Sequence, residues 1–182
     1  MKLVIMRHPE TNSIAGLSGD PDVPSPEGLV QLSRLIEVCQ REEVKGVVHS
    51  SLSRVVTPAK ALAQALQIPH IVQAELDERD FGDWNNWSWP QIAAKLDTLT
   101  LRERYVFTPP NGESWERLEA RLRAALQRIV SLGYDSVAIM THYGAIRALL
   151  PIVKNEPRES TLGLEVMNGE IFIQAYNQVT SS

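Results

Sequence analysis

The stretch KLVIMRHPET, residues 2–11, decides how the chain begins its fold. Four apolar residues, Leu3 to Met6, run directly into Arg7 and His8, and a proline follows. A short apolar run bounded by proline is typical of a buried strand, so we expect a strand that ends at Pro9. The side chains of Arg7 and His8 would then stand at its carboxyl end, where open α/β sheets bind ligands. On these residues alone, a solvated pair at the end of an ordinary strand is the alternative.

Strands and helices alternate along the rest of the chain. GVVHSS (46–51) and SVAIMTH (136–142) are two further apolar runs that predict strands. Helical spacing of apolar residues predicts four helices. The expected buried face of the first is Leu29, Leu32, Leu35, Ile36 and Cys39, and that of the second is Ala59, Leu62, Ala63 and Leu66. The third would bury Trp115, Leu118, Leu122, Ala125, Leu126 and Ile129, and the fourth Ala145, Ile146, Leu149, Leu150 and Val153.

Two remaining regions complete the predicted architecture. Residues 75–110 have an irregular pattern, and GLEVMNGEIFIQAY (163–176) predicts a hairpin with Asn-Gly at its turn. Strand–helix alternation indicates a three-layer α/β/α fold with a mainly parallel central sheet, and the hairpin would add an antiparallel edge.

Length and composition favour one domain over residues 1–182. The formal net charge of −4 gives no basic footprint for nucleic acid, and no Lys/Arg block suggests a membrane surface. The single Cys39 excludes an internal disulfide and a multi-cysteine metal site. No transmembrane run or signal peptide is recognisable, so we expect a cytoplasmic protein; the sequence carries no signal for the oligomeric state.

Each of the three predicted strands ends in polar residues. The first ends in Arg7-His8, the second in His49-Ser50-Ser51 with Arg54 close behind, and the third in Thr141-His142. If the strands are parallel neighbours, these residues gather at one edge of the sheet. Among them, Arg7 and Arg54 with His8 and His142, and no cysteine, point to an oxyanion ligand, because guanidinium groups match phosphate oxygens bidentately.

These motifs carry a family resemblance. MRHPET, SSLSR, LDERDFGDW, NGES and THYGAIRALL occur in the order seen in the histidine phosphatase (phosphoglycerate mutase-like) superfamily, over roughly residues 3–150. The chain looks most like the small phosphatases of that family. Its loop GLSGDPDVP (16–24) is similar to that of the α-ribazole phosphatases.

The resemblance implies a role for five residues. His8 would be the nucleophile and become a phosphohistidine, while Arg7, Arg54 and His142 would bind the nonbridging phosphoryl oxygens. Glu78 would protonate the leaving alkoxide and then take a proton from water. The resemblance implies no metal or other cofactor, because the arginines supply the positive charge.

Each role has a structural alternative. His8 could be a core histidine, Arg54 an ion-pair residue at a helix start, and Glu78 a solvated carboxylate in the acidic stretch ELDERD (75–80). His49 and His70 are interpreted as structural, and Arg147 as a surface or ion-pair residue. Glu113 and Ser114 are expected to serve a helix start, with Asn111 or Ser114 as its N-cap.

The chain departs from the family pattern at several positions. Pro9 and Tyr143 stand where glycine is common, Asn85-Asn86 where Glu-Gly is usual, and Thr57-Pro58 where Gln-Thr is usual. None of these changes removes a group with a predicted catalytic role.

We therefore predict a metal-independent phosphomonoester hydrolase acting on a small phosphorylated metabolite, with α-ribazole phosphate as one candidate. The alternatives are a phosphoglycerate mutase-type phosphotransferase and a non-catalytic phosphate-binding regulatory domain. A cap-like segment at about 84–110 would cover the cleft. Its aromatic residues Trp87, Trp89, Tyr105 and Phe107 either stack on a flat substrate or pack as core beneath a loop.

Overall fold

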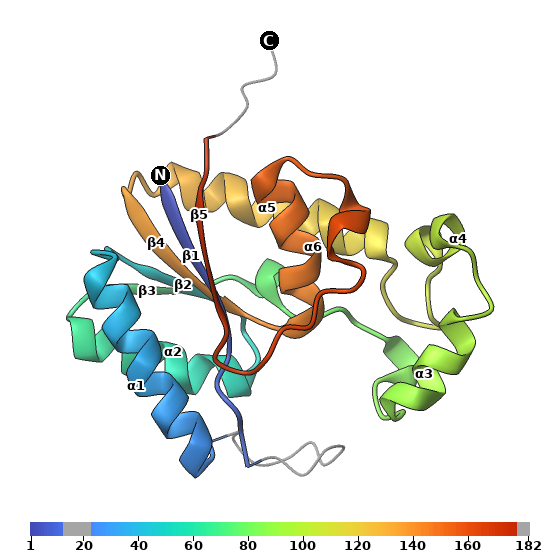
Figure 1. Ribbon diagram of the computed structural model, residues 1–182, viewed down its shortest axis with the longest axis horizontal. Coiled ribbons are helices and arrows are strands. Elements are labelled where there is room, and N and C mark those ends of the chain that lie inside the picture. The colour runs from blue at the N-terminus through green and yellow to red at the C-terminus, as the bar shows by residue number, and fades with distance from the viewer. Residues whose placement is uncertain (13–22, 178–182) are drawn as a thin grey trace.

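A five-stranded sheet forms the centre of the protein (Figure 1). The computed structural model describes residues 1–12 and 23–177. The strand order is β3-β2-β4-β1-β5, with bounds β1 Lys2–Arg7, β2 Val47–His49, β3 His70–Val72, β4 Ser136–Thr141 and β5 Ile171–Ala175. The pairs β3–β2, β2–β4 and β4–β1 are parallel, and β5 runs antiparallel to β1. The predicted mainly parallel sheet with an antiparallel edge is confirmed.

Helices cover both faces of this sheet (Figure 1). Helices α1 (Pro26–Arg41) and α2 (Ser53–Leu66) pack on one face, and α5 (Trp115–Ser131) and α6 (Tyr143–Lys154) pack on the other. Successive residues of a strand point to opposite faces. In β1, Leu3 and Ile5 therefore join the core under α5 and α6, while Val4 and Met6 join the core under α1 and α2. The three-layer α/β/α fold is confirmed.

The residues of the predicted buried faces are buried or half-buried, with one exception in α1. Its buried residues include Leu32, Leu35 and Cys39, but Leu29 is 56% exposed. The first turn packs through Gly28 instead: a Cβ at that position would lie 2.0 Å from the carbonyl oxygen of Glu10. Leu29, one residue further round the helix, is turned toward solvent for this reason.

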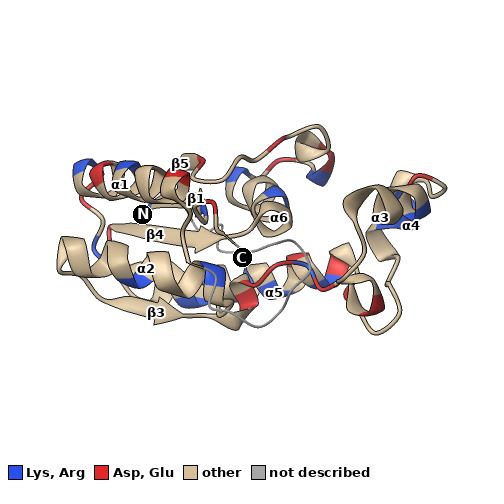
Figure 2. Cartoon of the chain, turned by 90° about the horizontal axis from the view of Figure 1, so that it is seen from below, with Lys and Arg blue, Asp and Glu red and all other residues tan. Residues whose placement is uncertain are grey.

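The segment predicted to be irregular contains two short helices, α3 (Trp89–Leu96) and α4 (Leu101–Val106), after the 3₁₀ turns η1 (Ala74–Leu76) and η2 (Gly82–Trp84). Both helices begin with a capping box, Ser88 with Gln91 and Thr100 with Glu103. The sequence-based prediction is wrong here because helices this short give little periodic signal. They lie beyond the start of α5, away from the sheet (Figures 1 and 2).

The hairpin predicted for residues 163–176 is wrong in its first arm. A turn with Gly169 at φ +70° precedes β5, but residues 163–167 form no strand. Their carbonyl groups serve side chains instead: Leu164 accepts from the Tyr143 hydroxyl, and Val166 accepts from Arg7. The polypeptide before the turn is thereby tied to the start of α6 and the end of β1.

No helix in the described part of the chain is long and apolar enough to cross a bilayer.

Candidate active site

Three parallel strands deliver the predicted residues to one edge of the sheet. In the register of β1 and β4, Arg7 lies opposite Thr141, and in that of β2 and β4, His49 lies opposite Met140. The residues that follow, His8, Ser50 and His142, therefore leave the sheet side by side. Helices α2 and α6 begin at the same edge, and Arg54 lies in the first turn of α2.

His8 is buried, and its ring is held in one tautomer. Its Nδ1 lies 2.8 Å from the carbonyl oxygen of Pro9. A carbonyl oxygen can only accept, so Nδ1 carries the hydrogen, and in the neutral imidazole Nε2 carries the lone pair. Proline at position 9, where the family commonly has glycine, lacks a backbone N–H but still has the carbonyl oxygen that this hydrogen bond needs. The His8 ring lies 5.3 Å, centroid to centroid, from the ring of His142.

A chain of hydrogen bonds fixes His142 on the other side of the site. Arg54 donates from Nε to Nδ1 of His142 over 3.2 Å. With Nδ1 accepting, Nε2 of the neutral ring donates to Ser50 Oγ over 2.8 Å. The Ser50 hydroxyl in turn donates to Asp77 Oδ1 over 2.6 Å. Asp77 also accepts from the amide and hydroxyl of Ser51, so its carboxylate anchors the whole chain.

The pKa of His142 is held well below its usual range. Burial is the main cause, because a charged imidazolium loses its hydration there, and the nearby positive charges of Arg54 and Arg7 and the His8 ring act in the same direction. His142 is therefore neutral at pH 7, in agreement with the proton positions of the hydrogen-bond chain.

Glu78 lies at the start of α6. Its carboxylate accepts from the backbone amides of Gly144 at 2.9 Å and Ala145 at 3.1 Å, and from the amide of Arg79 at 2.8 Å. The first N–H groups of a helix have no partner within it, and they favour negative charge. A Cβ at position 144 would lie only 2.6 Å from Oε1 of Glu78, so the carboxylate can approach the helix this closely because residue 144 is glycine.

Arg7 brings a partly buried cation to the same edge. Nη1 donates to the carbonyl oxygen of Val166 over 2.6 Å, and the guanidinium lies 5.5 Å from the ring centroid of Tyr143. Burial lowers the pKa of Arg7 from its usual value, and the charge of Glu78 partly offsets this. Among the described residues, Nε of Arg7 is buried without a hydrogen-bond partner.

Sequence reasoning missed the role of Arg121 on α5. Its guanidinium makes a two-pronged ion pair with Glu113, at 2.7 and 2.8 Å, and donates to the carbonyl groups of Glu75, Asp77 and Glu78. It thereby holds the strip of backbone that carries both Asp77 and Glu78. Glu113 acts through this pair rather than at the helix start, where Ser114 is the N-cap of α5.

Other residues singled out in the sequence lie outside this cluster. His49 and His70 contact each other, with Nε2 of His49 3.2 Å from Nδ1 of His70. Arg147 is half-exposed, as the surface alternative predicted; it makes no ion pair among the described residues and donates to the carbonyl groups of Thr161 and Leu162. Most of the loop 16–24 lies outside the described residues.

These contacts gather two guanidinium groups, two imidazoles and one carboxylate at one edge of the sheet. Partly buried guanidinium groups can bind an oxyanion, and a neutral imidazole with a lone pair on Nε2 can attack phosphorus. In the described part of the chain, no group of three or more His, Cys, Asp and Glu side chains is placed to hold a metal ion.

Comparisons with known proteins identify the relatives of this chain. The family model of the histidine phosphatase superfamily (branch 1) matches residues 3–180. A bifunctional protein of Mycobacterium tuberculosis is 32% identical over 117 residues, which are 62% of this chain and 32% of that protein. The chain thus matches about a third of that relative's length.

Two further relatives match over nearly the whole chain. The adenosylcobalamin/alpha-ribazole phosphatase of Salmonella typhimurium is 25% identical over 176 residues, which are 93% of this chain and 87% of that protein. The alpha-ribazole phosphatase of Shigella flexneri has a similar structure, with a TM-score of 0.79 and 24% identity over 98% of this chain and 92% of the other. This structural likeness shows the fold.

The depressed pKa of His142 predicts how stability depends on pH. In the unfolded chain this histidine binds a proton at its ordinary pKa of about 6.5, whereas in the folded protein it stays neutral to a lower pH. Below pH 6.5 the unfolded state therefore binds more protons, and stability falls as pH falls. Full protonation of one group corresponds to about 1.4 kcal/mol per pH unit.

Urea unfolding between pH 7.5 and 5.5 measures this effect. Below pH 6.5 the free energy of unfolding should fall more steeply in the wild type than in His142→Asn. His49, whose pKa is also lowered by burial, is present in both proteins and cancels in the comparison. Equal slopes would contradict a neutral His142 in the folded state.

Proposed function

The chain belongs to the histidine phosphatase superfamily, and from this premise we propose that it hydrolyses a small phosphomonoester through a phosphohistidine formed on His8. Members of this superfamily, including alpha-ribazole phosphatase, are phosphatase enzymes. One observation carries the proposal: Nδ1 of His8 is bonded to the Pro9 carbonyl oxygen, which leaves the lone pair on Nε2 at an edge that also holds Arg7 and Arg54.

The first half-reaction transfers the phosphoryl group to the protein. Nε2 of His8 attacks phosphorus, an N–P bond forms, and the bond from phosphorus to the ester oxygen breaks. Glu78, entering as the carboxylic acid, gives its proton to the departing alkoxide. In the second half-reaction Glu78 takes a proton from water, the resulting nucleophile attacks phosphorus, and inorganic phosphate leaves His8 neutral again.

The two arginines are suited to bind the phosphoryl oxygens. Nε of Arg7 is a buried donor that lacks a partner among the described residues, and leaving such a donor unsatisfied costs about 1–3 kcal/mol. A phosphoryl oxygen would satisfy it. Arg54 uses Nε to bond His142, and this bond does not consume the fork of its two terminal nitrogens.

His142 would serve mainly by holding Arg54 in place. In the observed arrangement Nδ1 accepts from Arg54 and Nε2 faces Ser50. A direct bond from Nδ1 to a phosphoryl oxygen, as the family resemblance implies, requires a proton on Nδ1. The negative charge of a bound phosphoryl group would favour that protonation, and Arg54 would then turn to the ligand.

The physiological substrate is proposed at the level of its class. The Salmonella typhimurium relative acts on alpha-ribazole phosphate according to its name and matches 93% of this chain. That likeness makes α-ribazole phosphate a specific candidate to test, within the broader class of small phosphomonoesters.

Turnover of p-nitrophenyl phosphate tests the proposal. We expect steady hydrolysis by the wild type, and a loss of at least about a thousandfold in kcat for His8→Ala, because the covalent route needs its imidazole. His70→Ala is the matched control, since this exposed histidine lies outside the cluster, and it should retain wild-type kcat. Hydrolysis that survives in His8→Ala, or a wild type that binds phosphate without turnover, would contradict the proposal.

The role of Glu78 predicts a dependence on the leaving group. Alkyl phosphates need a proton on the departing oxygen, whereas p-nitrophenolate leaves without help. Glu78→Gln should therefore lower kcat/KM for an alkyl ester at least tenfold more than for p-nitrophenyl phosphate. Glu75→Gln changes a carboxylate of the same acidic stretch and should lower neither. Equal losses for the two ester types in Glu78→Gln would show that Glu78 acts by structure alone.

A further inference from the structure

A cavity of about 390 Å³ opens beside the carboxyl group of Glu78. It lies between the segment that carries α3 and α4 and the segment formed by α6 and the 3₁₀ turn η3 (Arg158–Thr161). Glu78, Tyr143 and Gly144 are among its lining residues, and the amide of Gly144 is one of the groups that hold the Glu78 carboxylate. The cavity therefore continues directly from the group that faces the ester oxygen in the proposed reaction.

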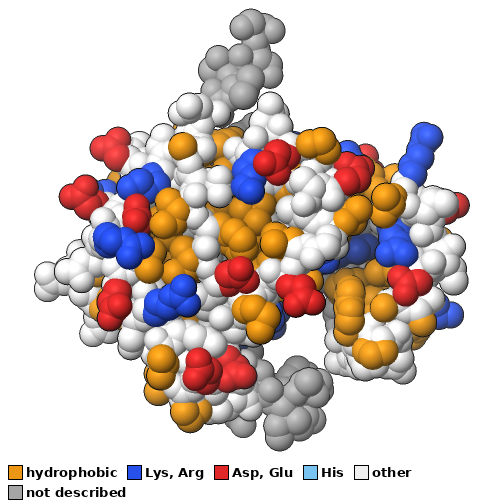
Figure 3. Space-filling view, in the orientation of Figure 1, with side chains coloured by type: hydrophobic (Ala, Val, Ile, Leu, Met, Phe, Trp, Pro, Cys, Tyr) orange, Lys and Arg blue, Asp and Glu red, His pale blue; other side chains and the backbone are white. Residues whose placement is uncertain are grey.

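Apolar and aromatic side chains make up half of the residues that line the cavity. They are Phe81, Trp89, Ala93, Leu96, Leu101, Tyr105, Trp115, Tyr143 and Leu162. Trp89, Leu101 and Leu162 are 59%, 53% and 49% exposed, although large apolar side chains are normally covered. Hydrophobic side chains are visible together at the α3–α4 end of the molecule (Figure 3). Exposed apolar groups around a concave surface mark a binding site.

The arginines of the wall are engaged with the protein itself. Arg79 and Arg147 each donate to two main-chain carbonyl groups. Arg104 forms an ion pair with a neighbouring aspartate at 3.1 Å, and Arg158 lies over the ring of Tyr105, 3.3 Å from its centroid. Three of these guanidinium groups lie over aromatic rings: Arg79 over Phe81 and Trp115, Arg147 over Tyr143, and Arg158 over Tyr105. They thereby hold the aromatic side chains in place.

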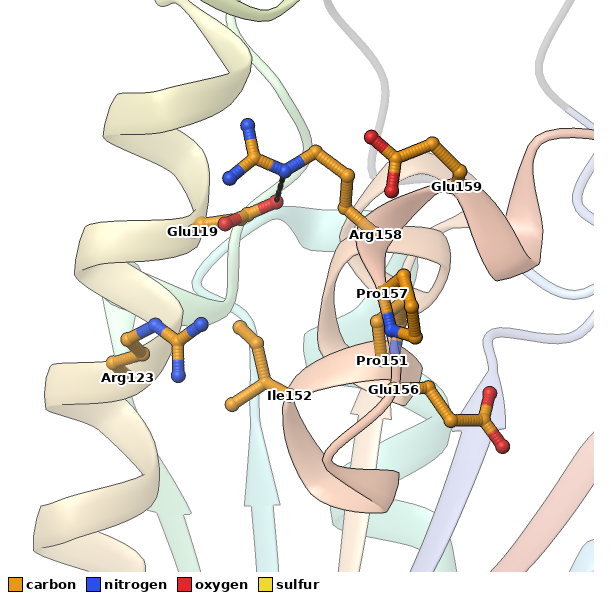
Figure 4. A pocket seen from close by; sticks show the side chains of 8 residues that line it. All are labelled: Glu119, Arg123, Pro151, Ile152, Glu156, Pro157, Arg158 and Glu159. Carbon is orange, nitrogen blue, oxygen red and sulfur yellow. Dashed lines mark ion pairs between the residues drawn. The ribbon is translucent and has the colours of Figure 1, made fainter.

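A second hollow, of about 310 Å³, differs in each of these respects (Figure 4). Charged side chains and prolines dominate its wall, and the ion pair of Glu119 and Arg158, at 3.9 Å, lies at one side. None of the five residues of the candidate active site lines it. It offers no continuation from the reacting atoms.

We propose that the cavity beside Glu78 holds the alcohol part of the substrate and selects a planar, largely apolar group. Rigid aromatic walls pair best with flat rings. Its volume of about 390 Å³ falls within the range of about 300–1,000 Å³ that is usual for small-molecule sites. In this proposal the cap-like segment 84–110 supplies the outer wall. The proposal rests on the proposed function, which places the ester oxygen at Glu78.

Four primary alkyl phosphates of similar intrinsic reactivity test the selection. They are 2-(2-naphthyl)ethyl phosphate, 2-cyclohexylethyl phosphate, glycerol 1-phosphate and 3-phosphoglycerate. We expect kcat/KM to be highest for the naphthyl ester, severalfold lower for the non-planar cyclohexyl ester, and at least about a hundredfold lower for the last two. Equal kcat/KM for the naphthyl and glycerol esters, or a preference for 3-phosphoglycerate, would overturn the proposal.

Two tryptophan variants locate the selecting surface. Trp89 lines the cavity, whereas Trp87 stacks on Trp84, 5.0 Å between ring centroids, and does not line it. In Trp89→Ala the ratio of kcat/KM for the naphthyl ester to that for the glycerol ester should fall about tenfold. In Trp87→Ala, the matched control, the ratio should stay at the wild-type value. An equal fall in both variants would contradict the assignment of the cavity.

A binding measurement separates this proposal from the proposed function. If the wild type hydrolyses none of the esters, the proposed function has failed, yet the cavity still predicts binding of the alcohol 2-(2-naphthyl)ethanol. In ¹H–¹⁵N spectra titrated with this alcohol, the indole N–H of Trp89 should shift in a saturable way and that of Trp87 should not. No shift at Trp89 would overturn the proposal whatever the activity.

Discussion

The parallel pairing of β1 with β4 is the constraint on which the rest of the site depends. It sets Arg7 opposite Thr141, so that the two histidines, 134 positions apart in the sequence, leave the sheet as neighbours. The amide of His8 donates to the carbonyl oxygen of Thr141 and continues the ladder by one more bond. A slip of one residue in this register would turn His8 or His142 to the opposite face of the sheet.

Around that edge, the protein holds charged groups by bonding them to one another and to the backbone. Asp77 positions His142 through Ser50, His142 positions Arg54, and the start of α6 receives Glu78. Arg121 binds the backbone beneath both Asp77 and Glu78. Because Asp77, Ser50, His142 and Glu78 have fixed partners, this part of the site is organised before any ligand arrives, as catalysis by preorganised charge requires.

Much of the fold was predictable from local pattern, whereas the supporting contacts were not. Apolar runs predicted β1, β2 and β4, and helical spacing predicted α1, α2, α5 and α6. No strand was predicted at β3, because this three-residue edge strand is largely exposed and gives no apolar run. The first arm of the expected hairpin is absent, because the backbone at 163–167 serves side chains of the site. The hydrogen bonds of Ser50 with Asp77 and with His142 join residues that are 27 and 92 positions apart, and no local sequence pattern predicts them.

The aromatic segment shows the same limit. Its composition left stacking on a substrate and packing as core equally open. Trp84 packs in a small core with Phe107, and Trp87 stacks on Trp84, while Trp89 and Tyr105 line the cavity. Tyr143, a departure from the family pattern, lines the cavity and lies against Arg7, so that a change at one position touches both the oxyanion site and the cavity wall.

The central claim is that His8 carries the phosphoryl group. Rapid acid-free quenching of the protein during turnover of a ³²P-labelled phosphomonoester, followed by peptide mapping, tests it directly. The account predicts a label on the peptide that contains His8, stable in alkali and lost in acid, as a phosphoramidate bond is. A label on another residue, or turnover with no labelled protein at any time, would contradict it.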